Sequence, residues 1–373
     1  MNQDPRLIAT LHARLILGRR SARAAARTAV FVLKVLPMLP SRPIDWVTPT
    51  PIRERVRYPS RHGEVEGEVA RPATSGPHPA ILVCLGVVPF GVEHPQVPRL
   101  QEALVRAGFV TLLYWSPTMR DCRLDPSDIE DLAMAYDWLV TQPFVDPARS
   151  GLMGTCVGGA FALMAAASPR IRDRVAFVGA YAPYASIRTL ARDIATATWS
   201  RNGTRAPWAV DPLTRKVYVH TLTADLESEE AARLRAALAE PDGALDPASL
   251  SPAGQAVYPL LTALTDDQFE PALHQLPATL RERLDAMSPL TYVADLRVPV
   301  VVLMHDQDDP VIPQAESGSL RDALAGRADV RYTVFVMFKH LDPAKVRLAL
   351  LPLLREVARF CRALYPMFRQ AVA

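Results

Sequence analysis

The chain has 373 residues, 49% of them hydrophobic, and a formal net charge of +3. This length and composition can fill a sizeable core, in one large domain with an insertion or in two small domains. The small net charge excludes a general affinity for polyanions, so we expect no nucleic-acid partner. The chain has four cysteines, Cys84, Cys122, Cys156 and Cys361. Their spacing fits neither a metal site nor a disulfide framework, which favours a reducing, cytoplasmic setting.

The first 50 residues form a basic and apolar segment that we predict to be helical. Apolar residues recur at helical spacing from Leu7 to Leu15, and an apolar run from Ala29 to Leu36 follows. That run is well short of the ~18 residues a membrane-spanning helix needs. The segment either lies on an anionic membrane surface, packs on the body of the protein or on a second copy of the chain, or is disordered. We expect residues 1–40 to be dispensable for chemistry.

From residue 51 on, strand patterns alternate with helix patterns. Apolar and β-branched runs predict strands, and amphipathic stretches between them predict helices. The predicted strands are 53–58, 64–70, 80–85, 109–115 and 174–181, and the predicted helices are 96–107 and 128–140. Such alternation predicts a mostly parallel sheet with helices on both faces, an α/β fold in which substrates lie beyond the carboxyl ends of the strands.

The most informative segment is Gly154-Thr155-Cys156-Val157-Gly158-Gly159. An apolar strand leads into it and a helical run leads out, which is the strand–turn–helix pattern G-x-S-x-G that presents a nucleophile, here with cysteine in place of serine. The small flanking residues permit the tight turn, and the positive end of the helix dipole favours a thiolate at Cys156. The plainer interpretation is a buried cysteine in a glycine-rich turn.

Residues 185–297 interrupt the alternation and are far longer than an ordinary connection, which is ~2–6 residues. Helix signals occur at 227–238, at 252–264 and at 280–287. We interpret this stretch as a helical cap inserted into a core made of residues 51–184 and 298–373. The large aromatic residues of the cap either pack within it or line a pocket: Trp199, Trp208, Tyr218 and Tyr258.

The acid candidate follows an apolar run, 298–304, that predicts a buried strand. Three aspartates stand in the turn after it. Asp309 directly precedes Pro-Val-Ile-Pro and is the residue that we predict to act, while Asp306 and Asp308 are the alternatives, with ordinary turn roles.

The histidine candidate is His340, just past a strand-like run at 331–338. His305 is the rival, but it lies within the strand that carries the acid turn. In the predicted mechanism His340 takes the proton of Cys156, and Asp309 orients the imidazole. The backbone N–H groups of Val157 and of Val87, with Val88 as the alternative to Val87, would bind the oxyanion.

With these motifs the chain resembles the dienelactone hydrolase family of α/β-hydrolases. The resemblance rests on G-x-C-x-G-G, on D-P-V-I-P, on the late histidine, on a hairpin starting at His62 and on Val145-Asp146-Pro147-Ala148-Arg149 before the nucleophile strand. It covers roughly residues 55–184 and 298–364. The resemblance implies a Cys-His-Asp triad, hydrolysis of esters or lactones, and no metal or organic cofactor. The long cap and the basic N-terminus depart from the compact members of the family.

Two other functions remain open at this stage. Polyhydroxyalkanoate synthases also use G-x-C-x-G-G, with an aspartate and a histidine in the same order, so an acyltransferase of that kind is one alternative. A hydrolase-like protein that binds a ligand without turnover is the other. For the hydrolase we expect a small ester or lactone as substrate, no nucleic acid, and either peripheral membrane contact or homo-oligomerisation through the N-terminal segment. We expect a cytoplasmic protein, with membrane association as the alternative.

Overall fold

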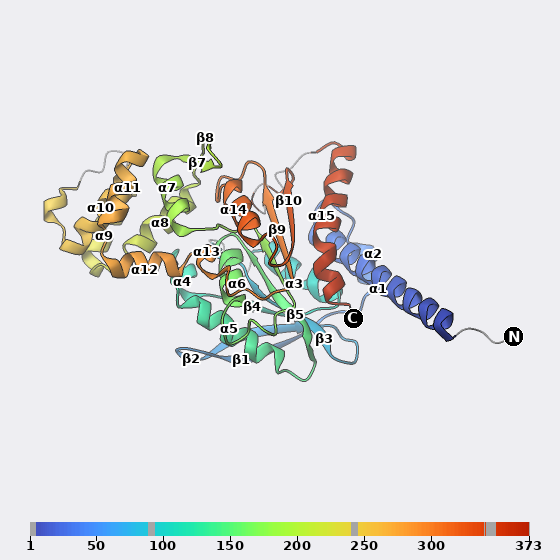
Figure 1. Ribbon diagram of the computed structural model, residues 1–373. Coiled ribbons are helices and arrows are strands. Elements are labelled where there is room, and N and C mark those ends of the chain that lie inside the picture. The colour runs from blue at the N-terminus through green and yellow to red at the C-terminus, as the bar shows by residue number, and fades with distance from the viewer. Residues whose placement is uncertain (1–4, 89–93, 240–244, 339, 341–347, 373) are drawn as a thin grey trace.

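A computed structural model describes residues 5–88, 94–239, 245–338, 340 and 348–372, with side chains from residue 18 onward. At its centre lies an eight-stranded sheet in the order β1-β2-β4-β3-β5-β6-β9-β10 (Figure 1). Its strands are β1 (Ile52–Ser60), β2 (Gly63–Arg71), β3 (His78–Cys84), β4 (Val110–Tyr114), β5 (Val145–Thr155), β6 (Phe177–Tyr181), β9 (Val300–Asp306) and β10 (Asp329–Phe335). The two hairpin strands β1 and β2 are antiparallel to their neighbours, and the remaining pairs are parallel.

Helices cover both faces of this sheet, because its central strands are apolar on both sides and every residue of β4, β6 and β9 is buried. One face carries α1 (Pro5–Val35), α3 (Gln96–Arg106) and α15 (Leu350–Gln370), and the other carries α5 (Asp128–Val140), α6 (Val157–Ala166) and α14 (Gln314–Leu324). Short helices are α2 (Arg42–Val47), α4 (Pro117–Arg120) and α13 (Pro289–Tyr292). The predicted mostly parallel α/β architecture is confirmed, although β6 begins at Phe177 rather than at residue 174.

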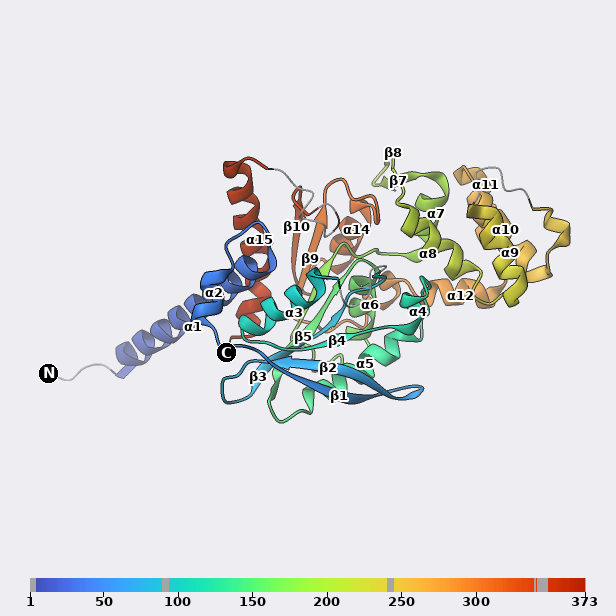
Figure 2. The ribbon, with the colours of Figure 1, turned by 180° about the vertical axis from the view of Figure 1, so that it is seen from behind.

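Between β6 and β9 the chain builds a separate group of helices with one small hairpin. Its elements are α7 (Ile187–Thr196), β7 (Thr198–Arg201), β8 (Thr204–Pro207), α8 (Pro212–Leu222), α9 (Ser228–Ala239), a 3₁₀ turn (Pro247–Ser249), α10 (Pro252–Thr262), α11 (Asp266–Gln275) and α12 (Ala278–Ala286). Both ribbon views place α9 to α11 at the opposite end of the molecule from α1 (Figures 1 and 2). We propose that residues 185–297 act as a cap over a core made of residues 51–184 and 298–373.

The second half of α1 packs on the body of the protein. Phe31, Val32 and Leu36 are each 1% exposed, and the Phe31 ring lies 6.2 Å from that of Phe360 and 5.6 Å from that of Phe368 in α15. The amine of Lys34 lies 2.5 Å from Asp45 and 3.2 Å from Glu102, so its charge ties α1 to α2 and α3. Removal of residues 1–40 would therefore remove part of the folded core, while their dispensability for the chemistry stays a prediction. None of the described helices is both long enough and apolar enough to cross a bilayer.

Replacing Phe31 by alanine should lower the free energy of unfolding by about 3–5 kcal/mol, because it opens a cavity between α1, α15 and the sheet. Urea titration followed by circular dichroism measures this loss. The matched control is Trp46→Ala in α2, whose side chain is 82% exposed and should contribute within about 0.5 kcal/mol. Equal stabilities of the two variants would mean that α1 does not belong to the folded core.

Candidate active site

Cys156 lies in a tight turn between β5 and α6, with φ of 55° and ψ of −136°. A residue with a side chain rarely adopts such a left-handed conformation, and it persists here because the surroundings impose it. The N–H of Cys156 donates to the carbonyl of Tyr181 at 2.7 Å. A Cβ at Gly154 would lie 2.3 Å from the carbonyl oxygen of Gly158, and one at Gly158 would lie 2.3 Å from that of Cys84. The glycines of the motif therefore let β3, β5 and α6 approach closely enough to hold the turn.

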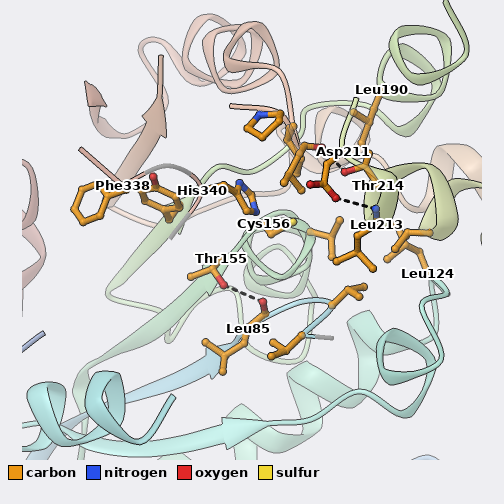
Figure 3. Close-up of a pocket in the computed structure, with 18 of the residues that line it drawn as sticks. Leu85, Leu124, Thr155, Cys156, Leu190, Asp211, Leu213, Thr214, Phe338 and His340 are labelled. Carbon is orange, nitrogen blue, oxygen red and sulfur yellow. Dashed lines mark hydrogen bonds between the residues drawn. The ribbon is translucent and has the colours of Figure 1, made fainter. Parts of the chain in front are cut away.

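The imidazole of His340 bridges an acid and the cysteine. Its Nδ1 lies 2.7 Å from Oδ2 of Asp309. The remaining ring nitrogen faces Cys156 (Figure 3), and the interaction between the two side chains contributes to the pKa of His340. Burial alone would lower the pKa of His340, but the bonds to Asp309 and Cys156 outweigh it and raise that pKa well above its ordinary value. The imidazole of His340 therefore holds a proton more readily than a free histidine does.

Asp309 is buried, with only 3% of its surface exposed, and hydrogen bonds hold both of its carboxylate oxygens. Its Oδ1 accepts the N–H groups of Val311 at 2.8 Å and of Ile312 at 3.1 Å. Burial acts to raise the pKa of Asp309, but the hydrogen bond to His340 and the charges of His340 and His305 hold it below its usual range. The carboxylate thus stays ionised while it orients the imidazole.

Residues of the cap donate hydrogen bonds to the turn that carries Asp309, and sequence patterns did not reveal these contacts. The indole N–H of Trp208 donates to the carbonyl of Asp309 at 2.8 Å, and the backbone N–H of Asp211 donates to that of Pro310 at 2.8 Å. The hydroxyl of Thr214 donates to the carbonyl of Val311 at 3.0 Å. The cap therefore helps to set the position of Asp309.

The rival residues have other partners. Asp306 does not touch the His340 ring; its carboxylate accepts the backbone N–H of His340 at 2.6 Å, the N–H of Phe338 at 3.1 Å and the hydroxyl of Tyr181 at 2.6 Å. His305 is fully buried between the hydroxyl of Ser317, at 2.6 Å, and the carbonyl of Ile312, at 2.9 Å.

Burial lowers the pKa of His305 and raises that of Asp306. Asp308 is an exposed turn residue. The structure thus brings together the predicted set Cys156, His340 and Asp309, and it assigns Asp306 a supporting position that the sequence analysis did not foresee.

Replacing Asp306 by asparagine should lower kcat for an ester about 10- to 100-fold with little change in KM, because at least one of the three hydrogen bonds that Asp306 accepts is lost, and two of these hold the loop that carries His340. The NH2 group of an amide cannot accept a hydrogen bond, so asparagine cannot replace both carboxylate oxygens as acceptors. Tyr181→Phe, which removes one donor only, should have a smaller effect. Steady-state kinetics and a thermal melt of each variant check this, since a merely structural role would lower stability while leaving the kcat of the folded fraction unchanged.

The predicted oxyanion donors lie beside Cys156. Val157 is the first residue of α6, so its N–H has no acceptor within the helix. Val87 follows Gly86, whose φ of 75° turns the chain at the end of β3. Val157, Val87 and Val88 all line the cavity above the cysteine. The rest of that turn, residues 89–91, lies outside the described residues, and the choice between Val87 and Val88 stays a prediction.

The cavity around Cys156 has a volume of about 580 Å³ and a mostly apolar wall. That size is typical of a site for a small organic molecule. Tyr218 of the cap lines it, whereas Trp208 serves the acid turn instead. Among the residues described by the structure, no group of three or more histidine, cysteine or acidic side chains is arranged to hold a metal ion.

Comparison with known proteins gives relatives by sequence and by structure. No family model matches the chain. It is 30% identical over 126 residues to a Bradyrhizobium protein named as a 2-oxo-3-(5-oxofuran-2-ylidene)propanoate lactonase, covering 30% of this chain and 50% of that protein. It is 28% identical over 188 residues to a Methylorubrum extorquens protein named as a carboxymethylenebutenolidase, covering 46% and 64%. The chain thus spans about half to under two thirds of the length of these relatives.

Solved structures with the same fold include an acylaminoacyl peptidase, with a TM-score of 0.53, 14% identity and coverage of 84% of this chain and 40% of that one. A Mycobacterium tuberculosis puromycin-hydrolyzing peptidase matches with a TM-score of 0.50 and 18% identity, over 86% of this chain and 39% of that one. At these identities the matches establish the fold alone.

Proposed function

The chain is an α/β-hydrolase similar to the dienelactone hydrolases, and we propose that it hydrolyses a carboxylic ester, thioester or lactone through an acyl-cysteine intermediate. The hydrogen bond between Asp309 and Nδ1 of His340, together with the position of Cys156 beside the other ring nitrogen, carries this proposal. Relatives named as a lactonase and as carboxymethylenebutenolidases support it. The apolar cavity above the thiol gives a substrate room to bind.

In the first half of the reaction, the sulfur of Cys156 attacks the carbonyl carbon of the substrate. His340 holds the proton of the thiol, and the charge that develops on the carbonyl oxygen meets the N–H groups of Val157 and Val87. The bond to the leaving group then breaks, and the leaving alcohol or thiol takes the proton from His340. Asp309 keeps Nδ1 protonated throughout, which leaves the other nitrogen free for both transfers.

In the second half, water replaces the leaving group. His340, now neutral, removes a proton from the water, whose oxygen attacks the carbonyl carbon of the acyl-cysteine. The carbon–sulfur bond breaks, the acid leaves, and the proton on His340 returns the site to its starting state. No further co-reactant is required for this balance.

Product analysis separates hydrolysis from the two alternatives. The full-length chain is incubated with a short p-nitrophenyl ester and, separately, with a 3-hydroxyacyl thioester. Steady release of free acid from the ester supports the proposal. Polymer from the thioester without turnover of the ester would indicate a polyhydroxyalkanoate synthase-like enzyme. Binding of both compounds without any product would indicate a non-catalytic binding protein.

For the N-terminal half of α1 we propose a partner outside the chain, either an anionic membrane surface or a second copy. This half extends away from the body (Figure 1), and Arg19 and Arg20 are exposed on it. Deleting residues 1–20, which removes both arginines, should abolish binding to anionic vesicles in the first case and reduce oligomer size in the second. Vesicle binding should also weaken with added salt, because salt screens the arginines. If the deletion changed neither vesicle binding nor oligomer size, both the membrane surface and the second copy would be excluded as partners.

A further inference from the structure

The cavity extends to both sides of Cys156. We use "cap arm" for the part lined by Leu124, Ile187, Leu190, Leu213, Val217 and Leu222, and "sheet arm" for the part lined by Phe31, Val35, Leu36, Met153, Phe338 and Phe360. Figure 3 shows Leu124, Leu190 and Leu213 on one side of Cys156, with His340 and Phe338 on the other. Both arms are walled by aliphatic or aromatic side chains, so each can bury an apolar part of a ligand.

The lining offers little to a charged ligand. No arginine or lysine occurs among the described residues that line the cavity. The carboxylate among them is Asp211, which caps α8 by accepting the N–H of Leu213 at 2.8 Å. A carboxylate brought into the cap arm would therefore lose its hydration beside another negative charge, which is strongly unfavourable. An uncharged chain meets no such penalty.

The position of His340 decides which arm receives which part of an ester. His340 must give its proton to the leaving group, so the leaving-group atom has to face the imidazole. The acyl part then points to the opposite side of Cys156, toward Leu124, Leu190 and Leu213 of the cap arm (Figure 3). The sheet arm, beside His340 and Phe338, is left for the alcohol.

From these observations we propose that the enzyme prefers an uncharged ester with an extended apolar acyl chain, which the cap arm holds. This proposal rests on the hydrolysis proposed above and adds the substrate class to it. It differs from a site for an anionic lactone, for whose carboxylate the described lining residues offer no arginine or lysine. The N-terminal helix takes part as well, because its residues Phe31 and Val35 belong to the wall of the sheet arm.

The first test is a series of p-nitrophenyl esters with the full-length chain. The value of kcat/KM should rise at least about 100-fold from acetate to octanoate, since each buried methylene is worth several-fold in binding. Hexanoate should exceed the adipate monoester, which carries a terminal carboxylate on the same chain, by about 100-fold or more. A flat profile, or a preference for the adipate monoester, would overturn the substrate class while leaving hydrolysis intact. No turnover of any ester and no acylation of Cys156 would instead refute the proposed function.

The second test locates the acyl chain with two matched variants at half-buried positions, Leu213→Trp in the cap arm and Val35→Trp in the sheet arm. Leu213→Trp should lower the octanoate-to-acetate ratio of kcat/KM about 10-fold or more, because the indole fills space that a long acyl chain would occupy. Val35→Trp should leave that ratio within about twofold and should instead change the preference among butyrate esters of different alcohols. The reverse pattern would place the acyl chain in the sheet arm. Circular dichroism shows whether each variant is folded.

Discussion

Replacing Cys156 by alanine should lower kcat for a neutral ester by about 10³-fold or more. Without the sulfur no acyl intermediate can form, and water would have to attack the bound ester directly. Steady-state kinetics measure the loss. The matched control is Cys361→Ala, which changes another half-buried cysteine, in α15, and should leave kcat within about twofold.

A Cys156→Ala variant that kept a tenth or more of the wild-type kcat would exclude a nucleophilic role for this residue. Loss of activity in Cys361→Ala as well would point to a general effect of cysteine replacement on folding. The thermal melt of both variants decides that point, because Cys156→Ala should remain folded while it is inactive.

Replacing Asp309 by asparagine should lower kcat by about 10³- to 10⁴-fold, because an amide can hold the imidazole in the wrong tautomer and cannot stabilise the imidazolium. The pKa of His340 should fall in this variant. Burial already acts to lower that pKa, and the bond to Asp309 is one of the two that outweigh it. Kinetics and NMR titration of the histidine ring measure the two effects.

The control for this variant lies one residue away. Asp308 is exposed in the same turn, so Asp308→Asn has the same chemistry without the contact and should leave kcat nearly unchanged. A similar loss in both variants, or an unchanged pKa of His340 in Asp309→Asn, would contradict the role given to Asp309.

Much of the site could be predicted because its signals are local. The glycines around Cys156, the prolines after Asp309 and the strand before His340 each fix a turn within a few residues, and parallel strands bring their carboxyl ends to one edge of the sheet. The helix α8 has a local signal too. Asp211 caps it and Pro212 occupies its first position.

Other features depend on residues that are distant in the chain, and no local pattern encodes them. Tyr181 donates to Asp306 across two neighbouring strands, and Trp208 reaches the acid turn from the cap. Phe31 meets α15, which is more than 300 positions away in sequence. An amphipathic segment such as α1 has the same pattern whether it packs on its own chain, on a second copy or on a membrane. Only tertiary contacts distinguish these cases.

Mass spectrometry of the protein after a brief mix with p-nitrophenyl octanoate tests the central claim most directly. The account predicts that the intact mass rises by one octanoyl group, that peptide mapping places the group on Cys156, and that the adduct disappears as free octanoate accumulates. In Asp309→Asn the adduct should form more slowly. Steady release of octanoate without any adduct on Cys156, or an adduct on another residue that turns over at the catalytic rate, would contradict the acyl-cysteine mechanism.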